Sequence, residues 1–210
     1  MFRIKICGIT TAGDAELAAS LGADAIGINF FRGSKRFVRP DDAAPIVSAI
    51  RGRAVPVAVF VDEDPSVIEE VCGKLRIGIV QLSGNEPAES AKNIALRRIK
   101  AIHLRDCRET GAFLHYPCEA YLVDAYAPGE FGGTGVSLDW KRIHGSALGK
   151  PWFLAGGLNP ENVMTAIRIA EPYGVDVASG VESQPGRKDP DKLKRFINIA
   201  MKGLGVERKI

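Results

Sequence analysis

The sequence has little of several features that mark specialised classes of protein. It contains four cysteines in 210 residues, and their wide spacing gives neither the density of a disulfide scaffold nor the close pairs of a zinc site. We therefore expect reduced thiols at Cys7, Cys72, Cys107 and Cys118. No apolar run is long enough to cross a bilayer, and the first residues lead directly into a strand pattern. These absences predict a cytoplasmic protein without a membrane partner.

Charge of one sign is also scarce. The net charge is +3 at pH 7, and the basic residues are scattered without an aromatic and basic face, so nothing indicates a nucleic-acid partner. A small anionic substrate is enough to explain the slight positive excess. The apolar content of 46% and the charged content of 25% are ordinary for a globular protein. The chain is long enough to bury a large core.

Apolar runs of strand length alternate with segments of helical period along the chain. The predicted strands are Arg3–Cys7, Ala25–Phe30, Val57–Val61, Ile77–Leu82, Ile99–Leu104, Tyr121–Asp124, Phe153–Ala155 and Val175–Ala178. The predicted helices are Thr11–Leu21, Pro40–Ile50, Pro87–Leu96, about Leu138–Leu148 and Asp189–Met201, with two more that begin at Pro65 and at Asn159-Pro160. Cys107–Glu119 fits a short helix or an irregular crossing equally well.

A strand followed by a crossover, repeated eight times, predicts an α/β fold with a parallel sheet buried on both faces. Closure into a single (β/α)8 TIM barrel over residues 1–210 is the natural solution, with residues 203–210 as a frayed tail. An open doubly wound sheet is the alternative, but its glycine fingerprint usually follows the first strand. Here the glycine loops follow the seventh and eighth strands, which favours the barrel.

Two strands in the last third of the chain run directly into glycine. Gly156 and Gly157 follow the seventh predicted strand, and Ser179 and Gly180 follow the eighth. Glycine lets the backbone approach a ligand closely, and a helix start beyond it offers free N–H groups and the positive end of a dipole. Either loop alone could simply form a tight turn. As a pair, they predict one phosphate group held from both sides.

Residues at the carboxyl ends of barrel strands face the active site, which selects further candidates. Cys7 ends the first predicted strand and Asp124 ends the sixth. A lone cysteine is often a small buried hydrophobic residue, and a strand-end carboxylate often caps a loop or pairs with a basic residue. Together, a thiol and a carboxyl at opposite sides of one mouth form an acid–base couple.

Two more charged residues lie where a ligand could meet them. Arg36 follows the second strand, where its guanidinium could form a bidentate pair with a ligand carboxylate, although a solvated basic loop is the plainer interpretation. Asp176 lies inside an apolar strand and could reach a substrate hydroxyl, with a structural hydrogen bond as the equal alternative. A glycine-rich loop from Gly129 to Gly135 could fold over the mouth.

At this point the chain resembles the phosphoribosylanthranilate isomerases of tryptophan biosynthesis. The stretches that match that family span nearly the whole chain in order. They are Lys5–Thr10, Gly22–Gly27, Ser34–Val38, Val59–Val61, Val80–Leu82, Asp124 with Phe131–Gly135, Leu154–Leu158 and Val175–Glu182. The combination is specific, although no single stretch would be.

The resemblance implies an intramolecular aldose–ketose isomerase that works without cofactor or metal. Its reaction is the Amadori rearrangement of N-(5-phosphoribosyl)anthranilate to the corresponding 1-deoxyribulose 5-phosphate. It implies Cys7 as general base, Asp124 as general acid, Arg36 as the contact to the anthranilate carboxylate, and the two glycine loops as the phosphate site. The chemistry requires a raised pKa or an acquired proton at Asp124, and it gains from a lowered pKa at Cys7.

Two departures from the family pattern and two rival functions accompany this interpretation. Ser83 stands where members often have His, and the loop after the second strand lacks the usual Tyr-Pro. A non-enzymatic phosphosugar-binding barrel would bind the product without turnover. Another phosphosugar enzyme, such as indole-glycerol-phosphate synthase or ribulose-phosphate epimerase, would show a catalytic lysine or a metal set that is not evident. We expect a phosphosugar as the small-molecule partner, and a monomer or homodimer.

Overall fold

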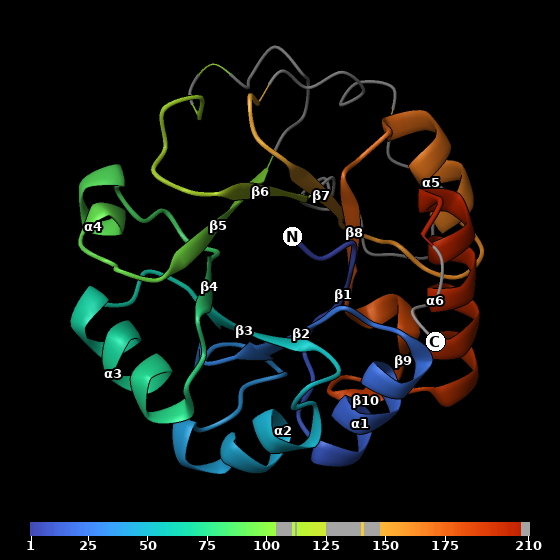
Figure 1. The fold of residues 1–210 in the computed structure, drawn as a ribbon, viewed down its shortest axis with the longest axis horizontal. Coiled ribbons are helices and arrows are strands. Elements are labelled where there is room, and N and C mark those ends of the chain that lie inside the picture. The colour runs from blue at the N-terminus through green and yellow to red at the C-terminus, as the bar shows by residue number, and fades with distance from the viewer. Residues whose placement is uncertain (104–110, 112, 125–139, 141–147, 207–210) are drawn as a thin grey trace.

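The computed structural model describes residues 1–103, 111, 113–124, 140 and 148–206. Its centre is a closed parallel barrel in which each strand pairs with the next and β1 pairs with β8 (Figure 1). The strands are β1 (Ile4–Ile6), β2 (Ala25–Asn29), β3 (Val55–Phe60), β4 (Ile79–Leu82), β5 (Arg97–His103), β6 (Ala120–Asp124), β7 (Trp152–Ala155) and β8 (Gly174–Val177). The predicted (β/α)8 barrel is therefore confirmed.

Helices surround the barrel as an outer layer (Figure 1). The α-helices among the described residues are α1 (Ala12–Leu21), α2 (Ala44–Ala49), α3 (Pro65–Leu75), α4 (Ala88–Lys92), α5 (Val163–Ala170) and α6 (Pro190–Leu204). Short 3-10 helices η1 (Pro40–Asp42) and η4 (Ser179–Val181) precede α2 and follow β8. A two-stranded hairpin, β9 (Glu182–Gln184) with β10 (Arg187–Lys188), follows η4. No helix in the described part of the chain has both the length and the apolar character to cross a membrane.

Local sequence explains where several helices begin. Thr11 accepts a hydrogen bond from Asp14 N with its hydroxyl oxygen, Asp64 caps α3 in the same way through Ser66 N, and Asp189 caps α6. Proline occupies the first helical position of α3 and α6, where its missing N–H has no partner to lose. These starts agree with the predicted ones because cap residues and proline act through the neighbouring backbone alone.

The apolar residues of each strand divide between two cores. One set faces the barrel interior and includes Val57, Ile79, Leu122 and Phe153. The alternate residues pack outward against the helices, in a larger cluster to which α1, α3, α5 and α6 contribute. A strand of four buried residues such as β4 belongs to both cores, since successive side chains point to opposite faces.

Some predicted boundaries differ from the structure. The helix predicted at Asn159-Pro160 begins later, at Val163, because Asn159 Oδ1 accepts hydrogen bonds from the N–H groups of Glu161 and Asn162 and closes a turn first. Propensity rules identify a capping asparagine but cannot tell a turn from a helix start.

Further differences concern both whole elements and the ends of helices. The segment predicted as one helix at 40–50 is divided into η1 and α2, and α4 is shorter than its predicted range. The sequence did not indicate the β9–β10 hairpin. α6 runs to Leu204, into the residues expected to form the tail. The glycine-rich loop 129–135, most of the helix expected near 138–148, and residues 107–110 and 112 lie outside the described residues.

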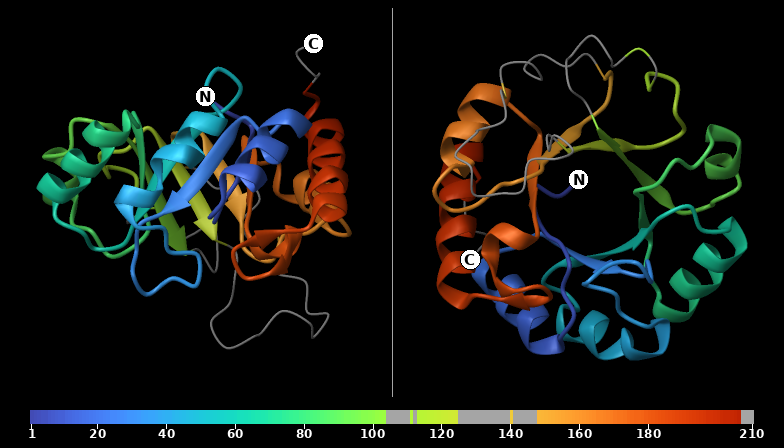
Figure 2. Two further views of the ribbon diagram at one scale, coloured as in Figure 1. Left: turned by 90° about the horizontal axis from the view of Figure 1, so that it is seen from below. Right: turned by 180° about the vertical axis from the view of Figure 1, so that it is seen from behind.

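The two ends of the barrel differ in what they carry. Figure 2 shows the N-terminus at one end and the β9–β10 hairpin at the other, where the strands finish. Because all eight strands are parallel, their carboxyl ends meet at this second end. This end holds the candidate residues.

Candidate active site

The proposed acid and base lie on the same rim of the barrel. Cys7 directly follows β1, and its backbone N–H donates to Val177 O of β8 over 2.8 Å. Asp124 is the last residue of β6, and its side chain is half-buried. The parallel order of the strands therefore brings thiol and carboxyl to one mouth, which is the position that sequence reasoning predicted for them.

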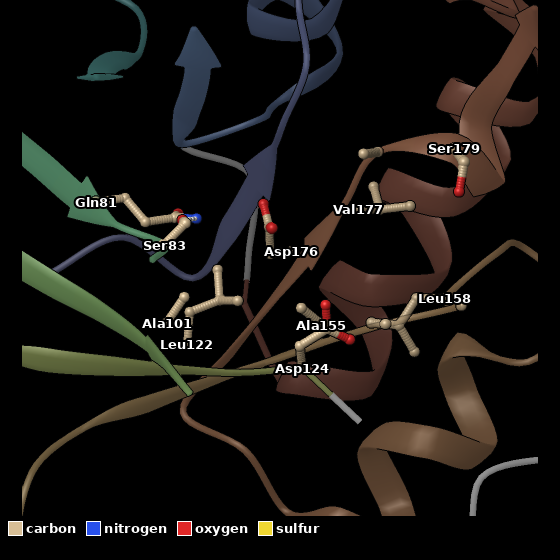
Figure 3. Close-up of a pocket in the computed structure, with 13 residues that line it drawn as sticks. Gln81, Ser83, Ala101, Leu122, Asp124, Ala155, Leu158, Asp176, Val177 and Ser179 are labelled. Carbon is tan, nitrogen blue, oxygen red and sulfur yellow. Dashed lines mark hydrogen bonds between the residues drawn. The ribbon is translucent and has the colours of Figure 1, made fainter. Parts of the chain in front are cut away.

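A cavity of about 320 Å³ opens at this mouth. Its lining includes Asp124, Asp176 and both glycine loops, represented by Gly156, Gly157 and Ser179. Figure 3 shows the two carboxyl groups directed into the same space, with Ser179 on the side away from β4. Cys7 is not part of the lining itself, but its thiol is close enough to Asp176 for the two to interact electrostatically.

The two glycine loops pack against each other through their backbones. Gly156 and Gly157 both have positive φ, at 82° and 63°, which favours glycine. A Cβ on Gly180 would lie 1.8 Å from the carbonyl oxygen of Leu158, so only glycine allows η4 to approach the loop after β7 this closely. The predicted convergence of the loops is thus present in the structure. Its basis is close backbone approach at Gly180.

The dipole argument for these loops needs correction. Neither loop opens directly into a long helix: α5 starts at Val163 and has eight residues, and the element after β8 is a 3-10 turn of three residues. The two loops therefore do not carry the two helix-end dipoles that the sequence predicted, and individual backbone N–H groups are the donors that they can offer an anion. Asn162 supports the first loop by donating from Nδ2 to Gly157 O over 2.9 Å.

Arg36 is held by a carboxylate of the protein. Its Nε donates to Glu182 Oε1 over 2.8 Å and its Nη2 to Oε2 over 2.6 Å, a bidentate pair that raises the pKa of Arg36. The side chain lies across Gly8, where φ is +70° and a Cβ would come within 2.2 Å of Arg36 Cδ. A guanidinium has five N–H donors, so donors remain after this pair forms. Sequence reasoning placed Arg36 in the correct loop but did not find its partner.

Lys188 of the β9–β10 hairpin is a buried cation that contacts the same Glu182 carboxylate. Its side chain is fully buried, and its Nζ lies 3.0 Å from Glu182 Oε1. The same ammonium donates to Cys7 O over 2.7 Å and to Ala178 O over 3.0 Å. Burial lowers the pKa of Lys188, and Glu182 offsets this only in part. One buried cation therefore connects the strand that carries Cys7 with the loop that precedes Ser179.

A second buried cation lies inside the barrel beside Cys7. Lys5 Nζ is 2.8 Å from Asp176 Oδ1, and the Lys5 side chain is 1% exposed. Burial alone would lower the pKa of Lys5, but Asp176 and the Cys7 thiolate raise it overall. The pKa of Cys7 is raised, because burial of the thiol outweighs the attraction of Lys5. The lowered pKa from which the chemistry would gain is therefore not found at Cys7, since sequence reasoning did not account for burial of the thiol.

On the opposite side of the cavity, β4 supplies an amide and a hydroxyl. Gln81 Nε2 donates to Ser83 Oγ over 2.9 Å, and both residues line the cavity (Figure 3). Gln81 Oε1 is buried and has no hydrogen-bond partner among the described atoms. Ser83, which departs from the family pattern, thus has a polar contact of its own.

Sequence reasoning missed Lys5, Lys188, Glu182 and Gln81 as members of the site. Lys5 carried a usable signal, because a lysine within a strand buried on both faces needs a buried partner. Lys188 carried none, since the hairpin that buries it was not predicted. Among the described residues, no group of three His, Cys, Asp or Glu side chains could hold a metal ion.

Comparisons with known proteins agree on one family. The family model described as N-(5'phosphoribosyl)anthranilate (PRA) isomerase matches residues 4–199. An N-(5'-phosphoribosyl)anthranilate isomerase of Geobacter sulfurreducens is 40% identical over 200 residues, which cover 95% of this chain and 98% of the relative.

Solved structures give the same result. The phosphoribosyl anthranilate isomerase of Thermotoga maritima superposes with a TM-score of 0.88 at 40% identity, covering 96% of this chain and 100% of that one. A phosphoribosyl anthranilate isomerase in complex with reduced 1-(o-carboxyphenylamino)-1-deoxyribulose 5-phosphate superposes with a TM-score of 0.83 at 38% identity, with the same coverage.

Proposed function

The chain belongs to the family of N-(5'-phosphoribosyl)anthranilate isomerases, and we propose that its isomerisation uses Cys7 as general base and Asp124 as general acid. The protein is an intramolecular isomerase of tryptophan biosynthesis with a TIM barrel fold. The observation that supports the assignment of roles is the shared rim: Cys7 follows β1 and Asp124 ends β6 at the same end of the barrel, where Asp124 lines a cavity that ends in two glycine loops. The rival functions are not favoured, because the family match spans nearly the whole chain.

The glycine loops are the proposed phosphate site. Gly156, Gly157 and Ser179 line one end of the cavity, and Gly180 packs closely against Leu158 beside them, so the backbone N–H groups of these residues are the proposed donors to the phosphate. A phosphate monoester carries a charge of about −1.5 to −2 at neutral pH, which such N–H groups stabilise. The related complex with the reduced phosphosugar supports a ligand of this chemistry. Bound there, the phosphate fixes the ribose between thiol and carboxyl.

Proton transfer then needs one acid and one base. Asp124 donates a proton to the ring oxygen as the ring opens to a Schiff base, and Cys7 as thiolate removes the proton from C2′. The resulting enol-amine becomes the ketose product when C1′ gains a proton and the hydroxyl on C2′ loses its proton, so this tautomerisation has no net proton change. Asp176, which faces the cavity, is the proposed contact for a ribose hydroxyl.

The carboxylate of the substrate is assigned to Arg36. The Glu182 pair fixes the guanidinium plane and leaves N–H donors that the pair does not use. A ligand carboxylate would therefore bind a cation that is already oriented. The cytoplasmic location and the choice between monomer and homodimer stay predictions.

The test follows the loss of phosphoribosylanthranilate fluorescence without added metal. We expect turnover by the wild-type protein, and a fall in kcat of at least about 10²-fold in Cys7→Ala and in Asp124→Asn with product affinity nearly unchanged. Cys72→Ala is the matched control, because this buried cysteine lies in α3 away from the mouth. Normal turnover in the Cys7 and Asp124 variants would refute the assigned roles. Product binding without turnover by the folded wild type would favour the non-enzymatic binder.

A further inference from the structure

A buried ion pair joins two neighbouring strands inside the barrel, next to the proposed base. Lys5 of β1 and Asp176 of β8 are register partners on neighbouring strands, and their side chains meet at 2.8 Å. Both residues are buried, at 1% and 7% exposure. Only Asp176 lines the cavity, so a ligand can reach the carboxylate but not the ammonium.

Cys7 shares its surroundings with Lys5. The two residues are separated by one position along the strand direction and therefore point to the same side. Both pack over Gly27 of β2, where a Cβ would lie 2.8 Å from Cys7 Sγ and 3.2 Å from Lys5 Cε. The absence of a side chain at Gly27 leaves room for sulfur and lysine together. The fixed charge of Lys5 is thus next to the atom that must ionise.

Four charged groups act on the thiol from the elements packed around it. Lys5 and Lys188 favour the thiolate and Asp176 opposes it, while Arg36, from the loop after β2, is itself influenced by the thiolate. After burial, Lys5 has the largest effect on the pKa of Cys7, and it lowers that pKa. Charges act strongly here because water is largely excluded.

We propose that Lys5 is a positioning residue that stabilises the Cys7 thiolate, and that Asp176 competes for the same ammonium until a substrate hydroxyl binds to Asp176. This inference rests on the proposed function, and it adds a way in which substrate binding controls the ionisation of Cys7. A hydroxyl that donates to Asp176 spreads the carboxylate charge over a second partner and weakens its hold on Lys5. The ammonium then acts more fully on sulfur.

The consequence is a base that is strengthened when the sugar is in place. The thiol releases its proton to solvent before or during binding, and the thiolate later takes the C2′ proton, so no other reagent is needed. Without a substrate hydroxyl, the Lys5 ammonium is paired with Asp176, which leaves the thiol largely protonated.

The test measures the alkylation of Cys7 by iodoacetamide against pH, with the modified peptide quantified by mass spectrometry. Alkylation reports the thiolate fraction without requiring turnover. In Lys5→Met we expect the profile to move to higher pH, with about tenfold slower reaction at pH 7, since loss of a close charge is on this scale. In Asp176→Asn we expect the profile to move to lower pH and the reaction at pH 7 to be several-fold faster.

Opposite shifts distinguish this proposal from a structural role. If the pair only supported packing, removing either partner would disturb Cys7 in the same sense. Lys100→Met, which removes another buried ion-paired lysine away from Cys7, should leave the profile unchanged. Shifts of equal sign in the Lys5 and Asp176 variants, or no shift in either, would overturn the proposal.

Two further measurements keep the result decisive. If Lys5→Met does not fold, the double variant Lys5→Met with Asp176→Asn removes both charges together and should still titrate above the wild type. A lower midpoint than wild type in that variant would also overturn the proposal. Cys7→Ala addresses the proposed function separately: normal turnover there, with opposite alkylation shifts here, would refute the catalytic role of Cys7 and leave the electrostatic link intact.

Discussion

Two sides of the barrel each contain a buried lysine–glutamate ion pair, and the two pairs form hydrogen bonds with different parts of the molecule. On the β8–β1 side, Lys188 pairs with Glu182 at 3.0 Å; on the β4–β5 side, Lys100 pairs with Glu86 at 2.7 Å. All four side chains are at most 5% exposed. In each pair, burial alone would raise the pKa of the glutamate, yet its cationic neighbours lower it overall. The chemistry of the two pairs is therefore closely matched.

The groups that form hydrogen bonds with the pair on the β8–β1 side all belong to the proposed site. Lys188 donates to the carbonyl oxygens of Cys7 and Ala178, and Glu182 holds the guanidinium of Arg36. The base, the entrance to the phosphate loop and the carboxylate-binding group are thus connected through a single ion pair.

The pair on the β4–β5 side forms its hydrogen bonds mainly with the backbone of a loop. Lys100 donates to the carbonyl oxygens of Leu82, at 3.3 Å, and Gly84, at 2.6 Å. Glu86 accepts from the N–H groups of Asp62 and Gly84. This pair closes the turn after β4 without contacting a proposed catalytic group. The comparison teaches that a buried ion pair of one design can serve stability alone or stability and catalytic geometry together, depending on which carbonyls it holds.

The largest expected effect separates the two lysines by activity. Lys188→Met should lower kcat/KM by about 10²-fold or more, because displacement of Cys7 and Arg36 by a fraction of an ångström disrupts the reacting geometry. Lys100→Met should leave kcat/KM within about threefold of wild type. Lys100→Met should reduce the free energy of unfolding by about 3–5 kcal/mol, since it removes the cation that pairs with the buried Glu86. Lys188→Met should reduce it by less, because Arg36 still pairs with Glu182. Steady-state kinetics and urea unfolding of both variants measure the two effects.

The same pair of variants can also contradict this comparison. Equal losses of activity in Lys188→Met and Lys100→Met, after correction for the folded fraction, would show that the two sides do not differ in function. Lys188→Met leaves the Glu182–Arg36 pair in place, so its loss of activity is attributed to the carbonyls of Cys7 and Ala178, which lose their donor.

Sequence reasoning predicted the fold well because local patterns determine strands and caps. The buried strands alternate with capped helices, and the parallel barrel then requires Cys7 and Asp124 to finish on one rim. The shared rim follows from topology alone. The same logic selected Gly180, whose contact with Leu158 makes the glycine indispensable.

The remaining parts of the site depend on contacts between distant segments. Glu182 meets Arg36 across 146 residues and Lys188 reaches Cys7 across 181. No periodicity encodes such a meeting, because the hairpin that carries Lys188 is short and has no apolar pattern of its own. The raised pKa of Cys7 was missed for the same reason, since burial depends on the assembled barrel.

An intermediate effect on KM should appear when glycine is replaced in the phosphate loops but not when it is replaced on the β4–β5 side. Gly180→Ala places a methyl group against the Leu158 carbonyl and must separate the two phosphate loops, so we expect KM to rise about tenfold, equivalent to about 1.4 kcal/mol. Inhibition by inorganic phosphate should weaken in parallel. Gly84→Ala is the matched control, because its methyl group would meet the carboxylate of Asp62, a side chain outside the cavity. An equal rise of KM in both variants would remove the phosphate loops as its cause.

The smallest expected effect concerns acid, where the two sides should behave alike. Glu182 and Glu86 have lowered pKa values in the folded protein, so each contributes stability above the unfolded value of about 4.3 and loses it as pH falls through the folded value. Glu182→Gln and Glu86→Gln should therefore each weaken the fall in the free energy of unfolding between pH 6 and pH 3. Urea unfolding at each pH at which unfolding is reversible measures this. Because the two pairs lie on different sides of the barrel, the double variant should weaken this fall by the sum of the two. A steeper decline in either variant would mean that the carboxylate is protonated more easily in the folded protein than in the unfolded chain, which is the opposite of what Lys188, Arg36 and Lys100 impose.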